Sequence, residues 1–143
     1  MDVRIQEGCD DTEIVIKCPE ATDEIKRIAS LLQDSGQKLS GIKDGQTHLI
    51  EKSDVFYCES VDKRYYIYTA DEVYQTYLKL YELEEHLPGS IFFRSSKSQI
   101  TNLKKIASLC PDFGGRIEAV MENGERIVVS RQYSKLLKER LGL

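Results

Sequence analysis

The sequence predicts a mostly β, α+β fold of small sheets with short helices, preceded by a small β-β-α extension at the N-terminus. Apolar and polar residues alternate through most of the 143-residue chain, which is the period of half-buried strands. Turn signals containing Gly, Asp or Asn recur between these segments. Helical spacing of apolar residues is confined to short stretches. The hydrophobic fraction of 41% and the charged fraction of 31% are typical of one globular domain with a small addition.

The extension, residues 1–40, is predicted to contain two strands and one helix. Residues 3–8, "VRIQEG", and 13–18, "EIVIKC", both alternate and are separated by the turn signal "GCDD". Thr22 is the expected N-cap of the helix, and Gly36 is the expected residue after its last turn. We expect this unit to serve dimerisation or the binding of a partner.

From Lys38 onward the pattern is rich in strands and hairpin turns. The turns are predicted at "KDG", at Lys52–Asp54, at "TADE" and at the Asn123–Gly124 pair of "MENGER". A short helix, "LYELEEHL", should stop at Pro88, and a second amphipathic helix should run from Gln132 to Leu141.

Charge is divided unevenly along the chain, whose formal net charge is −4 and whose pI is about 5.3. Residues 1–62 contain 7 Lys and Arg against 14 Asp and Glu, whereas residues 63–143 contain 13 against 10. This contrast is either chance unevenness or the mark of a C-terminal part that meets an anion. The acidic pI argues mildly against nucleic acid as that anion.

Catalytic and metal-binding motifs are missing from the sequence. There is no G-x-S-x-G, no H-E-x-x-H and no glycine-rich phosphate loop. The four cysteines form no C-x-x-C pair, so we expect reduced and mostly buried thiols. We therefore expect no enzyme activity, no metal, no cofactor and no small-molecule substrate.

The sequence contains no secretory signal and no apolar segment long enough to span a membrane, so the expected location is the cytoplasm.

Three short segments combine basic residues with Ser or Tyr just after predicted β elements. They are "DKRYY" at 62–66, "FRSSKSQ" at 93–99 and "SRQYSK" at 130–135. Such side chains can hold phosphate oxygens by charge-assisted hydrogen bonds and can reach base edges. Each segment taken alone is better explained as a solvated loop.

The order of these segments resembles the LytTR-type DNA-binding domain of bacterial transcription regulators. The similar region is Gly41–Leu141, and its most specific parts are "LYELEEHLPGSIFFRSSKSQITNLKKI", the later "NG" and "VSRQY". The resemblance implies an elongated β domain that reads DNA through loops between strands, not through a recognition helix. These loops would enter successive major grooves, usually at paired direct repeats, which also implies a homodimer. The implied DNA-binding residues are Lys63, Arg64, Tyr65, Arg94, Ser96, Lys97, Ser98 and Arg131.

The sequence departs from the family pattern at several points. Ser96 stands where many members have His, and Thr101 stands where many have Val. Well-known members also carry a receiver domain, for which the first 40 residues are too few, so the chain resembles a stand-alone regulator. By analogy with some stand-alone members, control by a membrane-protein partner is expected.

The predicted function is therefore a sequence-specific, DNA-binding transcription regulator. Lys63, Arg64, Lys97 and Lys135 would contact phosphates. Arg131 would read a base, because Arg pairs with guanine O6 and N7 through two hydrogen bonds. The alternative is a protein-interaction module of the same fold that has lost DNA binding, which the acidic pI and Ser96 favour.

Overall fold

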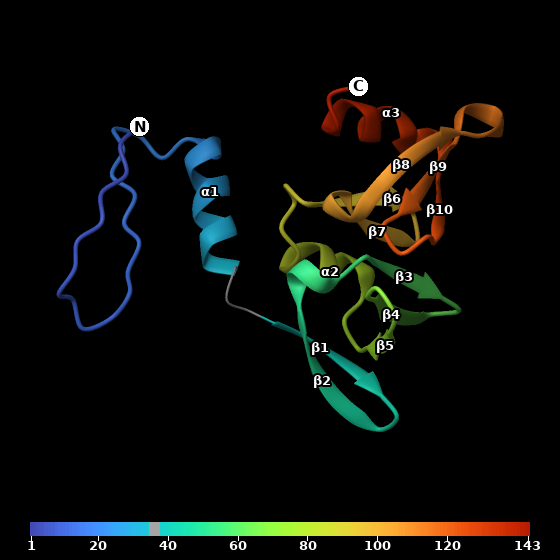
Figure 1. Ribbon diagram of the computed structural model, residues 1–143, viewed down its shortest axis with the longest axis horizontal. Coiled ribbons are helices and arrows are strands. Elements are labelled where there is room, and N and C mark those ends of the chain that lie inside the picture. The colour runs from blue at the N-terminus through green and yellow to red at the C-terminus, as the bar shows by residue number, and fades with distance from the viewer. Residues whose placement is uncertain (35–37) are drawn as a thin grey trace. The chain divides into compact units, whose positions relative to one another are not determined.

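The chain divides into two units, which are described separately. The computed structural model describes residues 1–34 and 38–143. The N-terminal unit is Met1–Gln33, and the C-terminal unit is Asp34–Leu143 (Figure 1). No helix among the described residues combines the length and the apolar character that crossing a membrane requires.

Helix α1, Asp23–Asp34, is the regular element of the N-terminal unit. The predicted N-cap residue, Thr22, is confirmed. Its hydroxyl accepts a hydrogen bond from the Ile25 N–H over 3.3 Å. Asp23 and Glu24 place negative charge in the first turn, where the helix dipole is positive. The predicted closing residue, Gly36, lies outside the described residues.

The two strands predicted at 3–8 and 13–18 are not formed. Residues 1–22 contain neither helix nor strand and form an exposed loop in Figure 1. Their apolar side chains remain in solvent, with Val3 86% and Ile14 62% exposed. Alternation stabilises a strand only when one face is buried, and a two-stranded hairpin without a covering layer is marginal in water. The β-β-α prediction was therefore right for the helix and wrong for both strands.

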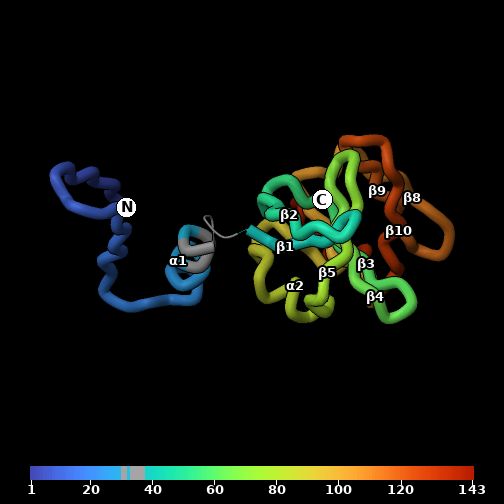
Figure 2. The backbone as a smooth tube through the Cα atoms, turned by 90° about the horizontal axis from the view of Figure 1, so that it is seen from below, coloured from blue at the N-terminus to red at the C-terminus, as the bar shows by residue number. Residues whose placement is uncertain are grey.

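The C-terminal unit is mostly β with short helices, as predicted, and its strands form two antiparallel sheets (Figures 1 and 2). The larger sheet has the order β2-β1-β5-β4-β3-β7-β6, and the smaller has the order β10-β9-β8. The strands are β1 (Lys38–Lys43), β2 (Gln46–Glu51), β3 (Tyr57–Val61), β4 (Arg64–Tyr68), β5 (Val73–Thr76), β6 (Phe92–Ser96), β7 (Gln99–Asn102), β8 (Ile106–Pro111), β9 (Ile117–Met121) and β10 (Arg126–Val129). The helices of this unit are α2 (Leu80–His86) and α3 (Arg131–Arg140).

Three of the four predicted turns join paired strands, whereas Lys52–Asp54 forms a short 3-10 helix between β2 and β3, which do not pair with each other. Asp44 and Gly45 both have positive φ, 51° and 75°, between the paired residues Lys43 and Gln46. Left-handed conformation at both central residues matches the right-handed twist of the flanking strands. Gly124, with φ 88°, lies at the tip between β9 and β10.

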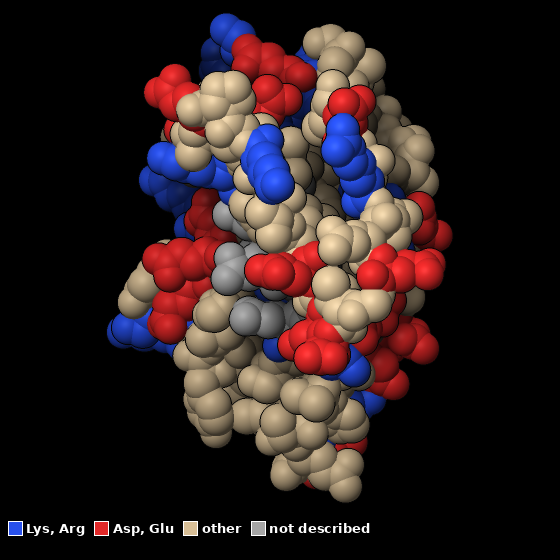
Figure 3. Space-filling view, turned by 90° about the vertical axis from the view of Figure 1, so that its left-hand side faces the viewer, with Lys and Arg blue, Asp and Glu red and all other residues tan. Residues whose placement is uncertain are grey.

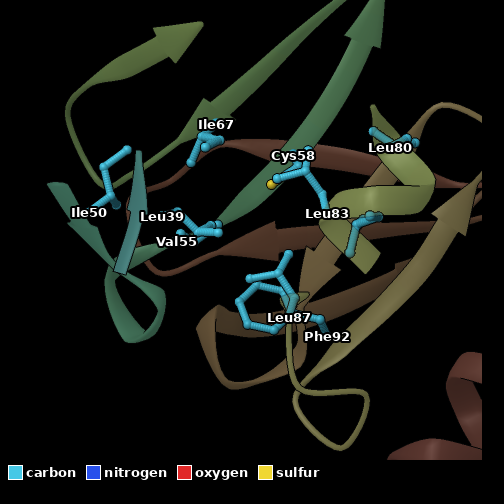
Figure 4. Close-up of a cluster of buried hydrophobic side chains, with 10 residues drawn as sticks. Leu39, Ile50, Val55, Cys58, Ile67, Leu80, Leu83, Leu87 and Phe92 are labelled. Atoms are coloured by element: carbon cyan, nitrogen blue, oxygen red, sulfur yellow. The ribbon is translucent and has the colours of Figure 1, made fainter. Parts of the chain in front are cut away.

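The main hydrophobic core lies between the larger sheet and α2 (Figure 4). Its fully buried members include Val55, Cys58, Ile67 and Leu83.

Burial raises the pKa of the Cys58 thiol to about 12, so this cysteine is neutral at physiological pH. The other three cysteines are exposed, so the expectation of mostly buried thiols was wrong. In the described part of the chain, no cluster of His, Cys, Asp and Glu could hold a metal ion.

A second core packs α3 onto the smaller sheet. Its buried residues are Phe93, Ile117, Ala119, Val129 and Leu137. Phe93 comes from β6 of the larger sheet, so this strand contributes to the burial of α3. A third cluster, made by Phe56, Tyr57, Met121 and Ile127, joins residues of both sheets. This shared cluster packs the two sheets of the C-terminal unit against each other.

Candidate nucleic-acid interface

The first basic segment forms the two-residue turn between β3 and β4. Asp62 and Lys63 have φ of 49° and 62°, and the flanking pair is Val61 and Arg64. A left-handed lysine is uncommon and costs backbone energy, so its tight turn is maintained by the strands on both sides. Lys63 and Arg64 are exposed, as a contact with DNA requires. Tyr65 is different, since it is half-buried and packs against the main core.

The second basic segment forms the turn between β6 and β7, and hydrogen bonds from the Arg94 side chain stabilise this turn. The Arg94 Nε donates to the Ser96 carbonyl over 3.1 Å, and Nη2 donates to the Lys97 carbonyl over 3.0 Å. Its Nη1 also pairs with the carboxylate of Glu84 on α2 at 3.0 Å. Every nitrogen of this guanidinium therefore has a partner within the fold, which favours a positioning role for Arg94.

The serines of this turn also bond to one another. The Ser98 N–H donates to the Ser96 hydroxyl over 3.2 Å, and the two hydroxyls are 3.3 Å apart. A bulge between Arg94 and Ser96 turns Ser95 inward, where its hydroxyl lies 2.8 Å from that of Thr101. The turn thus keeps Lys97 and Ser98 exposed on a backbone that several hydrogen bonds stabilise.

Backbone hydrogen bonds connect the three basic segments, which are far apart in sequence. The Ser60 N–H donates to the Ser98 carbonyl over 2.8 Å, so the β3–β4 turn adjoins the β6–β7 turn at the same end of the larger sheet. The Ser130 N–H donates to the Ser95 carbonyl over 3.2 Å, which brings the start of α3 next to β6. We call the four exposed cations nearest these contacts the basic row: Lys63, Arg64, Lys97 and Arg131.

Arg131 is the first residue of α3 and is exposed. Its aliphatic stem lies against Gly115, where an added Cβ would be 3.3 Å from the Arg131 Cγ. The helix dipole is positive at this helix end and favours a nearby anion. Lys135, one turn further along α3, is also exposed.

Two motif residues without a predicted contact role are buried and have structural contacts. Asn102 is 1% exposed, donates to the Val55 carbonyl over 2.8 Å and accepts from the Lys104 N–H over 2.9 Å. Phe93 is 7% exposed and meets the ring of Tyr133 edge-on, with 6.4 Å between ring centroids.

Sequence reasoning missed two features of this region. One is the contact of Arg94 with Glu84, ten residues earlier, for which the sequence carries no clear signal. The other is the approach of Gly115 to Arg131, for which the "GG" pair was a signal of unusual backbone geometry. Figure 3 faces the left-hand side of the view in Figure 1 and not the candidate interface, and on that face charged side chains of both signs are interspersed.

The family model and a solved structure point to the same family, and the curated relatives are named transcriptional regulators. Residues 45–142 match the model of the LytTr DNA-binding domain. The chain is 33% identical over 132 residues to an uncharacterized HTH-type transcriptional regulator of Staphylococcus aureus strain NCTC 8325, covering 91% of this chain and 89% of the relative. A similarly named relative from strain MRSA252 is 32% identical over the same length.

A solved structure shares the fold. It is the LytTr DNA-binding domain of a Bacillus cereus protein described as a methyl-accepting/DNA response regulator. The TM-score is 0.71 at 28% sequence identity, over 75% of this chain and 98% of the other. Among the residues described here, no two α-helices follow each other in the chain, so they form no helix-turn-helix unit.

Proposed function

The chain belongs to the LytTR DNA-binding domain family and is a DNA-binding transcription regulator, and we propose that its inter-strand turns read DNA in successive major grooves. The observation that supports this proposal most strongly is the continuity of the basic row. Residues from three distant segments adjoin through the hydrogen bonds of Ser60 with Ser98 and of Ser130 with Ser95. A duplex lying along this row would meet cations from two turns of the larger sheet and from the start of α3.

The residues of the interface have different roles in this proposal. Lys63, Arg64 and Lys97 neutralise phosphates from exposed turns, and Lys135 does so from α3. Arg131 reads a guanine, because its planar guanidinium can bond O6 and N7 together. Arg94, Ser96 and Ser98 hold the β6–β7 turn in the shape that presents Lys97.

The second candidate function is a protein-interaction module of the same fold that does not bind DNA. The acidic pI and the position of Ser96 favour this candidate, since its hydroxyl is already bonded within the turn. The two candidates differ in how binding responds to salt. Four phosphate contacts predict that log K falls with log salt at a slope of about −3 to −4.

Selection of bound duplexes from a random DNA pool tests the proposed function directly. We expect recovery of a direct repeat with about one helical turn between its halves. Arg131→Ala should weaken binding to the selected duplex by roughly 1–3 kcal/mol and relax specificity at one base pair. Lys63→Asn should instead weaken binding to all duplexes alike and make the salt slope shallower by about 1.

The substitution at Lys63 is chosen so that the β3–β4 turn keeps its backbone conformation. Asparagine tolerates positive φ, so Lys63→Asn removes the charge without changing the hairpin. Equal loss on selected and random DNA after Arg131→Ala would contradict base reading. No binding to any duplex even at low salt would favour the protein-interaction module.

We assign self-association or partner binding to the N-terminal unit. It supplies much of the negative charge of the chain, which would repel DNA, and its first 22 residues are exposed along their whole length. Two copies bound to a direct repeat would gain affinity through effective concentration. A membrane protein is one kind of partner that this unit could meet, by analogy with stand-alone regulators of the family.

A further inference from the structure

The connection between β8 and β9 presents a phenylalanine to solvent. Phe113 is 86% exposed. A single exposed apolar side chain is common on protein surfaces and needs no explanation by itself. Phe113 differs from such a residue in two respects, which are the rigidity of its backbone and the position of its loop.

The backbone around Phe113 is held on both sides. The Phe113 N–H donates to the Asp112 carboxylate over 2.8 Å, and the Arg116 Nε donates to the Phe113 carbonyl over 3.1 Å. The Asp112 N–H also donates to the Arg116 carbonyl over 2.9 Å, and their side chains form an ion pair at 3.6 Å. An apolar group held in this way loses little conformational entropy when it binds.

Two glycines allow the loop to reach the basic row. Gly114 and Gly115 have φ of 70° and 80°, which only glycine adopts without strain. At Gly115 the loop lies against the stem of Arg131, since a Cβ there would be 3.3 Å from the Arg131 Cγ. In Figures 1 and 2 the β8–β9 connection and the β3–β4 turn lie on the same side of the C-terminal unit. The loop that carries Phe113 therefore adjoins the Arg131 end of the basic row.

We propose that Phe113 packs on the C5 methyl group of a thymine next to the base pair that Arg131 reads. This inference rests on the proposed function. Thymine presents a methyl group in the major groove, and it is the apolar feature of that surface that a protein can recognise. The Asp112–Arg116 ion pair neutralises the only carboxylate of the loop, so the loop can approach DNA without net repulsion. Phe113 and Arg131 would then specify two adjacent base pairs.

The test combines one protein variant with one DNA variant. The full chain is first used to select duplexes from a random pool, and each thymine of the selected duplex is then replaced by deoxyuridine, which lacks the methyl group. We expect one replacement, beside the guanine that depends on Arg131, to weaken binding about fourfold, the contribution of one buried methyl group. Phe113→Ala should weaken binding at least as much and should abolish the effect of that replacement.

Two further variants make the result specific. Leu49→Ala is the matched control, because Leu49 is 69% exposed on β2, the strand at the edge of the larger sheet opposite β6. It should bind like the wild type and keep the sensitivity to deoxyuridine. Phe113→Leu keeps an apolar side chain and should keep part of that sensitivity. Thermal unfolding of each variant verifies that the fold is intact.

The possible results separate this inference from the function on which it rests. If Phe113→Ala binds the same sequences with unchanged affinity while Arg131→Ala does not, the inference is wrong and the proposed function stands. If Phe113→Ala weakens binding but no deoxyuridine replacement does, Phe113 has another contact and the inference is again wrong. If wild-type protein binds no duplex at low salt, both fail. A change of oligomeric state in Phe113→Ala would identify a second copy of the chain as its partner instead.

Discussion

Arg94 and Arg131 both belong to the predicted interface, but their surroundings give them different roles. The guanidinium of Arg94 bonds two carbonyls of its own turn and the carboxylate of Glu84. Arg131 is exposed at a helix start, with its stem alongside Gly115. At the scale of single residues, these partners are the reason for proposing that Arg94 positions the turn and that Arg131 reads a base.

Asn102 is a buried motif residue whose side chain makes hydrogen bonds within the fold. Asn102→Ala removes the amide that bonds the Val55 carbonyl and the Lys104 N–H. Because the amide is buried, we expect the free energy of unfolding to fall by roughly 1–3 kcal/mol, measured by urea denaturation. The control is Asn123→Ala, whose amide bonds the Ala70 carbonyl at an exposed hairpin tip. Equal losses in the two variants would show that burial does not decide the cost.

At the scale of elements, the β6–β7 hairpin adjoins both of the other segments of the proposed interface. Its bulge turns Ser95 into the core, and its turn is bonded to Arg94 on one side and adjoins β3 on the other. Such cross-links restrict how the exposed Lys97 can move. For the proposed contact with DNA, such a preorganised hairpin would lower the entropy cost of association.

Arg94→Lys tests whether this preorganisation matters. Lysine keeps the positive charge but cannot bond two carbonyls and a carboxylate in one plane. We expect the affinity for the selected duplex to fall about tenfold, which corresponds to about 1.4 kcal/mol, while the slope of log K against log salt stays unchanged. Fluorescence anisotropy at several salt concentrations measures both quantities.

The matched control for this variant is Arg126→Lys. Arg126 is an exposed arginine of β10 that pairs with Glu118 on the neighbouring strand. It should leave DNA binding unchanged. A shallower salt slope in Arg94→Lys would contradict the positioning role, because it would mean that Arg94 itself contacts phosphate.

At the scale of the whole molecule, the two units have different physical characters. The C-terminal unit has its own cores and both sheets, whereas the N-terminal unit consists of α1 and an exposed loop. An exposed loop with apolar side chains such as Val3 and Ile5 can gain stability by binding a surface. The proposed role in self-association follows from this composition.

Removal of the N-terminal unit tests that role. A chain of residues 38–143 should fold, because the cores described above lie within it. We expect it to be monomeric in analytical ultracentrifugation and to bind a single half-site as the full chain does. Its affinity for the paired repeat should be lower, because the two copies are no longer linked. Unchanged oligomeric state and unchanged affinity for the repeat would remove the assignment.

Local patterns predicted most of the elements of the C-terminal unit. The turns at Asp44–Gly45 and Asn123–Gly124 were predictable because Asp44, Gly45 and Gly124 have positive φ, which favours these residue types. Helices α2 and α3 were predictable from their spacing and from Pro88. The absence of strands at 3–8 and 13–18 was not predictable from the pattern. Alternation shows that a strand there would have one apolar face, but not whether another layer covers that face.

By itself, the sequence determined the family, the mostly β fold and the residue types that would meet DNA. These depend on motif order and on interactions between close neighbours, which a linear pattern records. Only the tertiary structure decided that Arg94 fastens a turn, that Tyr65 packs on the core and that Phe113 lies in the loop beside Arg131. These relations depend on contacts between residues distant in the chain, and packing of the two sheets creates them.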